Sequence, residues 1–206
     1  MEPTDAQRYC ELMAEIKARS NLIMHVGEGR VGALPTGPRV EFVYLQLRKI
    51  IELIAMGSLL ANASSFAHIQ SKIEKYWNAK DLLNDIQTLN PDFYPRPIIQ
   101  KASTEPGVKM QWLDRRDDFL TKERFITLYD KCGSILHVRN PFVPEQDFGK
   151  FEKAAPKWYL WIVNLLNAHI IRLIGGTKLY LIQMGSDVEP PTYTIFVPST
   201  RRPRGV

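Results

Sequence analysis

The residues best suited to chemistry lie together in one short segment of the C-terminal half of the chain. His137, Arg139 and Asn140 follow one another closely and stand directly before Pro141. A histidine can take up and release a proton near neutral pH, and an arginine can hold a phosphate through paired hydrogen bonds. We therefore predict His137 as an acid–base group and Arg139 as a phosphate clamp, which makes these two the candidate catalytic residues.

Three polar side chains are candidates for binding. Asn140 can hydrogen-bond a ligand, and Lys131 and Arg48 are assigned to the same role. A structural interpretation of the segment stays open beside the functional one. Basic side chains in the last turn of a helix stabilise the negative end of its dipole, and an Asn-Pro pair commonly ends a helix.

Motifs of established enzyme classes are missing from the sequence. It contains no glycine-rich phosphate loop, no His-Glu-x-x-His, no Cys-x-x-Cys and no Gly-x-Ser-x-Gly. The two cysteines and four histidines are too scattered to predict a zinc site, so no metal and no cofactor is expected. Cys132 and His137 do not suit a nucleophile and its base, because five positions along a helix point roughly 140° apart. Whether the chain is an enzyme stays open.

Two further groups are interpreted as structural. His169 stands between Ala168 and Ile170 in an apolar segment, which favours a core histidine with its hydrogen bonds satisfied. A cluster of aromatic residues follows several lysines and would suit base stacking, but such aromatics more often fill a core. This cluster consists of Lys150, Lys153, Lys157, Trp158, Tyr159 and Trp161.

The elements that must position these residues are mainly helices. Apolar residues recur at helical spacing, and capping residues, glycines and prolines mark the ends. The longest apolar stripe predicts a helix that lies at the centre of a bundle. The expected helices cover residues 5–26, 40–63, 64–76, 81–89, 121–138 and 146–174, the last with an interruption near Pro156.

Two pairs of short segments are predicted to form β-hairpins. Residues 96–102 can pair with 108–114 across a Pro-Gly turn, and residues 178–184 with 192–197. The predicted fold class is therefore α+β, mainly α, as a helical bundle that carries two β-hairpins. We expect one domain over residues 1–200, followed by a basic and disordered tail over residues 201–206.

Composition limits the functional classes. The chain has 206 residues, 45% hydrophobic and 24% charged, as in ordinary globular proteins. Its net charge is +5, and the three arginines of the tail account for three of these charges, so +2 is left for the body. The sequence begins without the pattern of a signal peptide and has no apolar run of membrane-spanning length. A cytoplasmic protein that does not enter membranes is expected.

The order of three features resembles the HEPN superfamily of helical bundles. These features are the apolar helix with Leu47-Arg-Lys-Ile-Ile-Glu52, the segment Leu136-His-Val-Arg-Asn-Pro-Phe142 and the long aromatic helix that follows. The resemblance covers residues 40–175. It implies RNA as a partner, and either RNase activity or a non-catalytic role in microbial defence or a toxin–antitoxin system.

The arginine–histidine pattern of active HEPN members is not matched at His137. Asp130, Lys131 and Cys132 occupy the places where the arginine is expected. Arg19 and His25 have the required spacing, but they lie in the first predicted helix, where the family does not place the pair. Two functions follow as predictions: RNA binding, with or without cleavage, and a non-catalytic interaction module that forms a homodimer.

Overall fold

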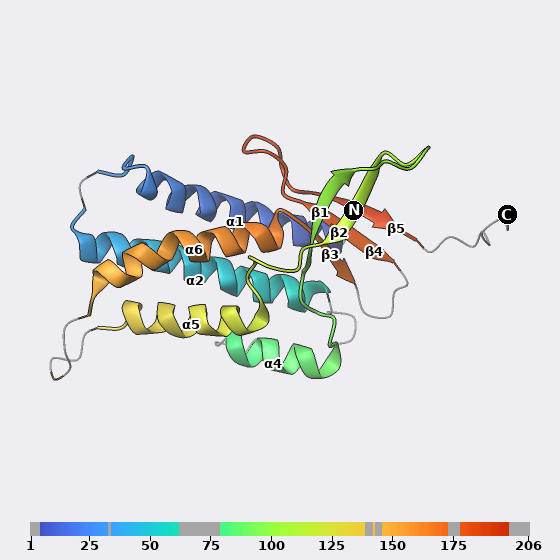
Figure 1. The fold of residues 1–206 in the computed structure, drawn as a ribbon. Helices are drawn as coiled ribbons and strands as arrows, with labels where there is room; N and C mark the ends of the chain where they lie inside the picture. The colour runs from blue at the N-terminus through green and yellow to red at the C-terminus, as the bar shows by residue number, and fades with distance from the viewer. Residues whose placement is uncertain are drawn as a thin grey trace.

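The structure, a computed structural model, describes residues 5–32, 34–61, 79–138, 142, 146–172 and 178–197. Helices and strands form a mixed α+β fold in which a group of helices carries a sheet at one end (Figure 1). The helices in this part of the chain are α1 (Asp5–Gly27), α2 (Thr36–Ala61), α4 (Ala79–Leu89), α5 (Lys122–Leu136) and α6 (Phe148–Leu166). The strands are β1 (Arg96–Ala102), β2 (Met110–Asp114), β3 (Ala168–Arg172), β4 (Leu179–Gln183) and β5 (Thr192–Phe196).

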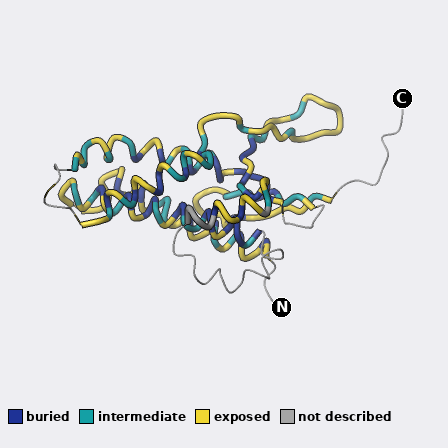
Figure 2. Tube along the Cα trace, turned by 90° about the horizontal axis from the view of Figure 1, so that it is seen from below, coloured by how far each residue is buried: buried dark blue, intermediate teal, exposed yellow. Residues whose placement is uncertain are grey.

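Helix α2 lies at the centre and contacts α1, α4, α5 and α6. Its apolar residues recur at helical spacing and are fully buried at Leu47, Ile50 and Ile51, among others. Along the helices, buried stretches alternate with exposed ones (Figure 2). Burial of this stripe against the surrounding helices is the main source of stability expected for the bundle.

The start of α2 differs from the prediction. The helix begins at Thr36, whereas we expected Pro38 to lie in the preceding loop. A proline is tolerated in the first turn, because the N–H groups there have no acceptor within the helix. The N-terminus of α5 is as predicted, since the Thr121 hydroxyl accepts a hydrogen bond from the Arg124 backbone N–H at 3.3 Å.

The final predicted helix is too long and is corrected. Helix α6 ends at Leu166 and the chain continues as β3, so residues 168–172 form a strand and not a helix. Pro156 lies inside α6 without interrupting it. The adjacent β-branched residues Ile170 and Ile171 suit a strand that is buried on both faces.

Strand β3 joins the two predicted hairpins into one sheet. The β1–β2 and β4–β5 hairpins have formed as expected, and the antiparallel order is β2-β1-β3-β4-β5. β3 pairs with β1 on one side and with β4 on the other. The central strand, β3, therefore has hydrogen-bonded neighbours along both edges. If α6 continued through these residues, the sheet would lose these inter-strand hydrogen bonds.

The two faces of this sheet have different neighbours. Register places Ile171 and Ile182 on the face that joins the main core with the helices. Ile170 and Leu181 pair directly on the other face, where they belong to a separate small apolar cluster with Ile98. We call this second face the open face of the sheet.

His169 is a core residue, as predicted, although it lies in a strand. Its ring is fully buried on the bundle side, where the Tyr9 hydroxyl lies 2.9 Å from Nε2 and the Leu166 carbonyl 2.8 Å from Nδ1. The carbonyl can only accept, so Nδ1 carries the proton and the Tyr9 hydroxyl donates to Nε2. Burial lowers the pKa of His169 to about 4.

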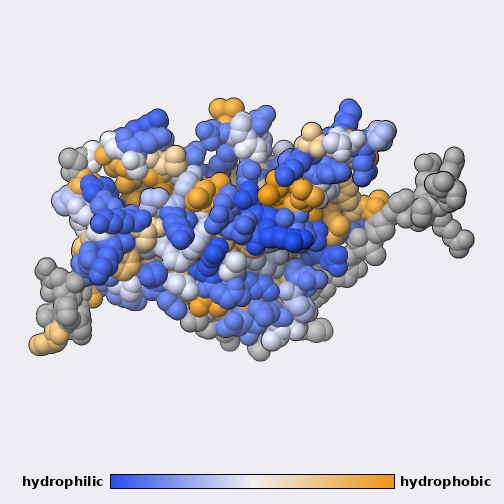
Figure 3. Space-filling view, viewed as in Figure 1, coloured by the Kyte–Doolittle hydropathy of each residue, from blue (hydrophilic) through white to orange (hydrophobic). Residues whose placement is uncertain are grey.

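Two predicted segments, the helix over residues 64–76 and the tail over residues 201–206, lie outside the described residues. Within the described part of the chain, no helix combines the length and the apolar character that a bilayer crossing requires. On the face seen in Figure 3, hydrophobic residues form small groups separated by hydrophilic ones.

Candidate functional site

The predicted catalytic histidine lies at the C-terminal end of α5. His137 is the C-cap residue, its side chain is exposed, and its backbone N–H donates to the Gly133 carbonyl at 3.3 Å. The following residue, Val138, is 98% exposed. Arg139 and Asn140 lie outside the described residues, so their predicted roles stay predictions.

Arg48 on α2 lies against α5 near Gly133, which is one helical turn before His137. Its guanidinium donates to the Glu52 carboxylate at 3.0 Å and to the Tyr129 hydroxyl at 2.7 Å, and it lies 4.3 Å from the centre of the Tyr129 ring. A Cβ added to Gly133 would be 3.6 Å from Arg48 Nη1. These contacts give Arg48 a role in holding the two helices together.

Lys131 is exposed and lies on a different side of α5 from Arg48. Its ammonium is 6.0 Å from the ring centre of Phe151 on α6. Cys132, next to it, is fully buried, and burial raises the pKa of its thiol to about 12. The structure therefore does not bring Lys131 and Arg48 into one site.

A groove on the open face of the sheet gathers more charge than this helix end. A cavity of about 550 Å³ lies between the strands, the loop before β1 and the N-terminus of α5. Its charged lining consists of Asp92, Arg96, Asp114, Arg115, Lys122, Glu123 and Arg172. Basic residues thus outnumber the acidic ones in the lining.

Two of these arginines are not fully engaged by the residues that the structure describes. Arg115 Nε is buried and makes no hydrogen bond to any part of the chain that the structure describes. Arg172, at the end of β3, is exposed and has no ion pair among the same residues. A buried donor without a partner costs free energy, which an anionic ligand would recover.

Four of the other five charged groups of the lining make contacts within the chain, namely Arg96, Asp114, Lys122 and Glu123. Arg96 Nε lies 3.7 Å from the Asp114 carboxylate, and both side chains are more than half exposed. The Lys122 ammonium donates to the Pro91 carbonyl at 3.2 Å. A hydrogen bond from the Thr121 hydroxyl lowers the pKa of the Glu123 carboxyl, so that this group stays ionised at neutral pH.

Aromatic side chains extend the groove across the sheet. Trp112 on β2 and Phe196 on β5 meet edge to face, with ring centres 4.6 Å apart, and Trp112 is 39% exposed. A hollow of about 170 Å³ lies beside them and shares Arg96, Asp114, Ile170 and Leu179 with the basic cavity. The two hollows therefore adjoin each other, and we call them together the sheet groove.

The sequence did not reveal the sheet groove, because its parts come from distant segments. Arg115 follows β2, Arg172 ends a strand that we predicted as helix, and Phe196 lies near the end of the described chain. With β3 assigned as helix, nothing connected the two hairpins. Alternation of polar and aromatic residues in Thr192–Phe196 was the available signal for an exposed strand.

Comparison with known proteins adds no relative. No family model, no curated protein and no solved structure matches the chain significantly. Among the described residues, no group of three histidine, cysteine or acidic side chains is arranged to hold a metal ion. The chemistry that the sheet groove offers is recognition: hydrogen bonds and charge for anions, and aromatic rings for stacking.

Proposed function

We propose that the protein binds single-stranded RNA in the sheet groove. The observation that carries the proposal is the adjacency of two hollows, one lined by Arg115 and Arg172 and the other by the aromatic pair of Trp112 and Phe196. Single strands are bound where basic groups follow the phosphates and aromatic rings stack on splayed bases. RNA binding also fits the cytoplasmic location predicted from the sequence.

Binding without cleavage is the form of this function that the geometry favours. The sheet groove lies at the N-terminus of α5, whereas His137 lies at its C-terminus. Helix α5 has 15 residues, so the two places are about 22 Å apart along its axis. A strand seated in the groove would have to extend along the whole helix to bring a phosphate to His137.

The role in microbial defence or in a toxin–antitoxin system that the HEPN resemblance implies stays a prediction. It depends on Arg139 and Asn140 together with His137, and only His137 among these is described. RNA binding in the sheet groove does not require that resemblance. A protein with or without such a role could contain the sheet groove, because the groove is built from the sheet and the start of α5.

Fluorescence anisotropy with a labelled ten-nucleotide RNA of mixed sequence tests the proposal. The double variant Arg115→Ala/Arg172→Ala removes two phosphate contacts, so affinity at low salt should fall at least about tenfold and the salt slope by about 0.7 per lost contact. Trp112→Ala should weaken binding by about 1–3 kcal/mol through lost stacking. The matched control is Lys150→Ala/Lys153→Ala, which removes two exposed cations on α6.

The controls decide the outcome. Equal losses in the groove variants and in the α6 variants would mean that binding is diffuse electrostatic attraction, and the proposal would be wrong. Absence of any binding at low salt would also refute it. Each variant is first compared with the parent by circular dichroism and thermal unfolding, so that a folding defect is not read as a binding defect.

Self-association is a second candidate function, favoured by the edges of the sheet. In the described residues β2 and β5 each pair on one side only, and Leu113 and Ile195 are 42% and 45% exposed. Open edge strands with apolar side chains can pair with a second copy. Light scattering distinguishes this homodimer from the monomer, and a dimer that dissociates when Ile195 is replaced by Lys would support it.

A further inference from the structure

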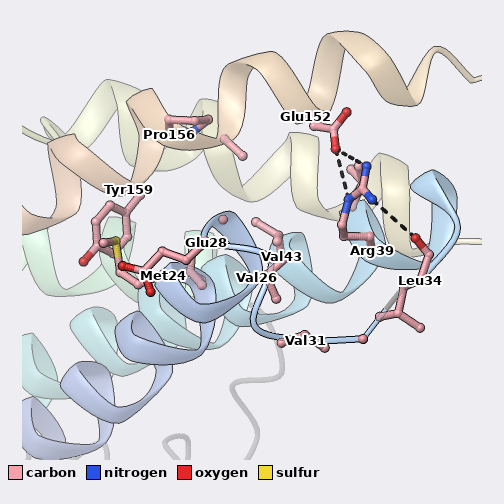
Figure 4. Close-up of a pocket in the computed structure, with 16 residues that line it drawn as sticks. Met24, Val26, Glu28, Val31, Leu34, Arg39, Val43, Glu152, Pro156 and Tyr159 are labelled. Carbon is pink, nitrogen blue, oxygen red and sulfur yellow. Dashed lines mark hydrogen bonds and ion pairs between the residues drawn. The ribbon is translucent and has the colours of Figure 1, made fainter.

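A second cavity lies at the end of the molecule opposite the sheet. It is open to solvent on one side and is bounded by the C-terminal half of α1, the connection to α2, the start of α2 and residues 152–159 of α6 (Figures 1 and 4). Its volume of about 860 Å³ falls within the range of pockets that take small organic ligands. None of its lining residues belongs to the sheet groove.

The lining of this cavity is largely aliphatic. Side chains from three helices converge on it, and the ring of Tyr159 closes one end (Figure 4). The main apolar lining residues are Met24, Val26, Val31, Val40, Val43 and Pro156. At Gly27, Gly29 and Gly32 the wall borders open space, since a Cβ at any of them would find no atom within 4 Å.

The charged groups at the cavity are already paired with one another. Arg39 donates through Nε at 3.1 Å and through Nη2 at 2.5 Å to the Glu152 carboxylate, and through Nη1 to the Leu34 carbonyl at 3.3 Å (Figure 4). The Glu28 carboxylate forms an ion pair with Arg30 Nε at 2.9 Å. A charged head group placed among these residues would compete with an existing pair, whereas an uncharged head group would leave the pairs intact.

From this arrangement we infer that the cavity binds an uncharged, mainly hydrocarbon molecule, of the kind represented by a medium-chain alcohol. Burial of the hydrocarbon against the aliphatic wall supplies the affinity. The internally paired charges select against fatty acids and against alkylamines of the same length. The inference is independent of RNA binding, since the two sites lie at opposite ends of the molecule.

Three probes with the same chain and different head groups test the inference by isothermal titration calorimetry on the full chain. Decanol should bind saturably below its solubility limit, while decanoate and decylamine at neutral pH should bind at least about tenfold more weakly, because their charges find no partner. Equal affinity for all three probes would overturn the selectivity, and no saturable binding of decanol would overturn the site.

One pair of variants locates the binding, and a third variant tests the role of charge. Val31→Trp adds bulk at the cavity wall in an exposed loop and should abolish decanol binding, while Leu160→Trp, at a 52% exposed position of α6 outside the cavity, should leave it unchanged. Glu152→Gln frees the Arg39 guanidinium and should raise the affinity for decanoate about tenfold or more. If Glu152→Gln leaves the ranking of the probes unchanged, the charge argument is wrong.

A second copy of the chain is the competing occupant. Met24, Val31 and Leu34 at the cavity are each about two-fifths exposed and could instead be covered by a partner. Light scattering of the parent and of Val31→Trp separates the two. A dimer that Val31→Trp dissociates, together with no saturable binding of decanol, would replace the small ligand by a protein interface.

Discussion

At the residue scale, the buried pair of Tyr9 and His169 connects the helices to the sheet. Tyr9 comes from α1 and His169 from the central strand, and both are almost completely buried. Because Nδ1 donates to the Leu166 carbonyl and Nε2 accepts from Tyr9, the neutral ring has both nitrogens satisfied. Burial of the ring away from water disfavours its charged form, which lowers the pKa of His169 to about 4.

The stability of the fold should therefore depend on pH through His169. Above pH 6.5 the imidazole is neutral in both the folded and the unfolded chain. As the pH falls from 6.5 toward about 4, the unfolded chain takes up a proton that the folded chain refuses, so stability falls, by about 3 kcal/mol in all. Urea unfolding at a series of pH values measures the decline.

A comparison of two histidine variants isolates this effect from the carboxylates. His169→Gln should flatten the profile between pH 6.5 and 5, although it lowers stability at pH 7. His25→Gln, at an exposed position of α1, should keep the slope of the parent. A parent profile that is already flat over this interval would show that His169 is not held neutral.

At the element scale, α5 connects the sheet groove to His137. Its N-terminus forms part of the sheet groove and its C-terminus carries His137. The Thr121 hydroxyl caps the groove end by accepting from the Arg124 backbone N–H. Arg124 in turn donates to the Phe119 carbonyl at 2.7 Å and lies 3.8 Å from the ring centre of Trp161 on α6, so the helix start is fixed from several sides.

Removal of the Thr121 cap should lower the free energy of unfolding, whereas a threonine-to-alanine change inside the helix should not. Thr121→Ala leaves an N–H at the helix end without its acceptor and should lower the free energy of unfolding by about 1 kcal/mol. Thr127→Ala is the matched control, because Thr127 lies in the exposed middle of α5 and alanine is the better helix former there. Chemical denaturation measures both.

The cap prediction has a conservative check. Thr121→Ser keeps the hydroxyl and should retain most of the stability. If Thr121→Ala and Thr127→Ala change stability by the same amount, then the hydroxyl at position 121 contributes nothing as a cap and the loss of the methyl group explains both.

The success of the sequence predictions also varies by element. Helices with a clear apolar stripe and a recognisable start, such as α1 and α5, were predicted closely, because local spacing and caps determine them. The helix predicted over residues 168–172 was wrong. Ala168–Arg172 has no polar alternation, and a short apolar run after a helix resembles a continuation of that helix. Pairing with β4, which follows closely, and with β1, which is distant in the chain, makes this segment a strand.

At the scale of the whole molecule, the two candidate sites lie at opposite ends. The sheet groove lies where the sheet meets α5, and the aliphatic cavity lies where α1 turns into α2 (Figure 1). The sequence pointed to neither, because each is formed by segments that are distant along the chain. His137 could be identified as a candidate from its neighbours in the sequence. Arg115 and Arg172 could not, because they come together only when β3 joins the sheet.

Photo-crosslinking tests the central claim, RNA binding in the sheet groove, most directly. A ten-nucleotide RNA that contains 4-thiouridine is bound to the full chain at low salt and irradiated, and the crosslinked peptides are identified by mass spectrometry. We predict crosslinks to peptides with Trp112, Arg115 or Phe196, and their loss in Arg115→Ala/Arg172→Ala. Crosslinks confined to the His137 peptide or to the lysines of α6, unchanged in that variant, would contradict the account.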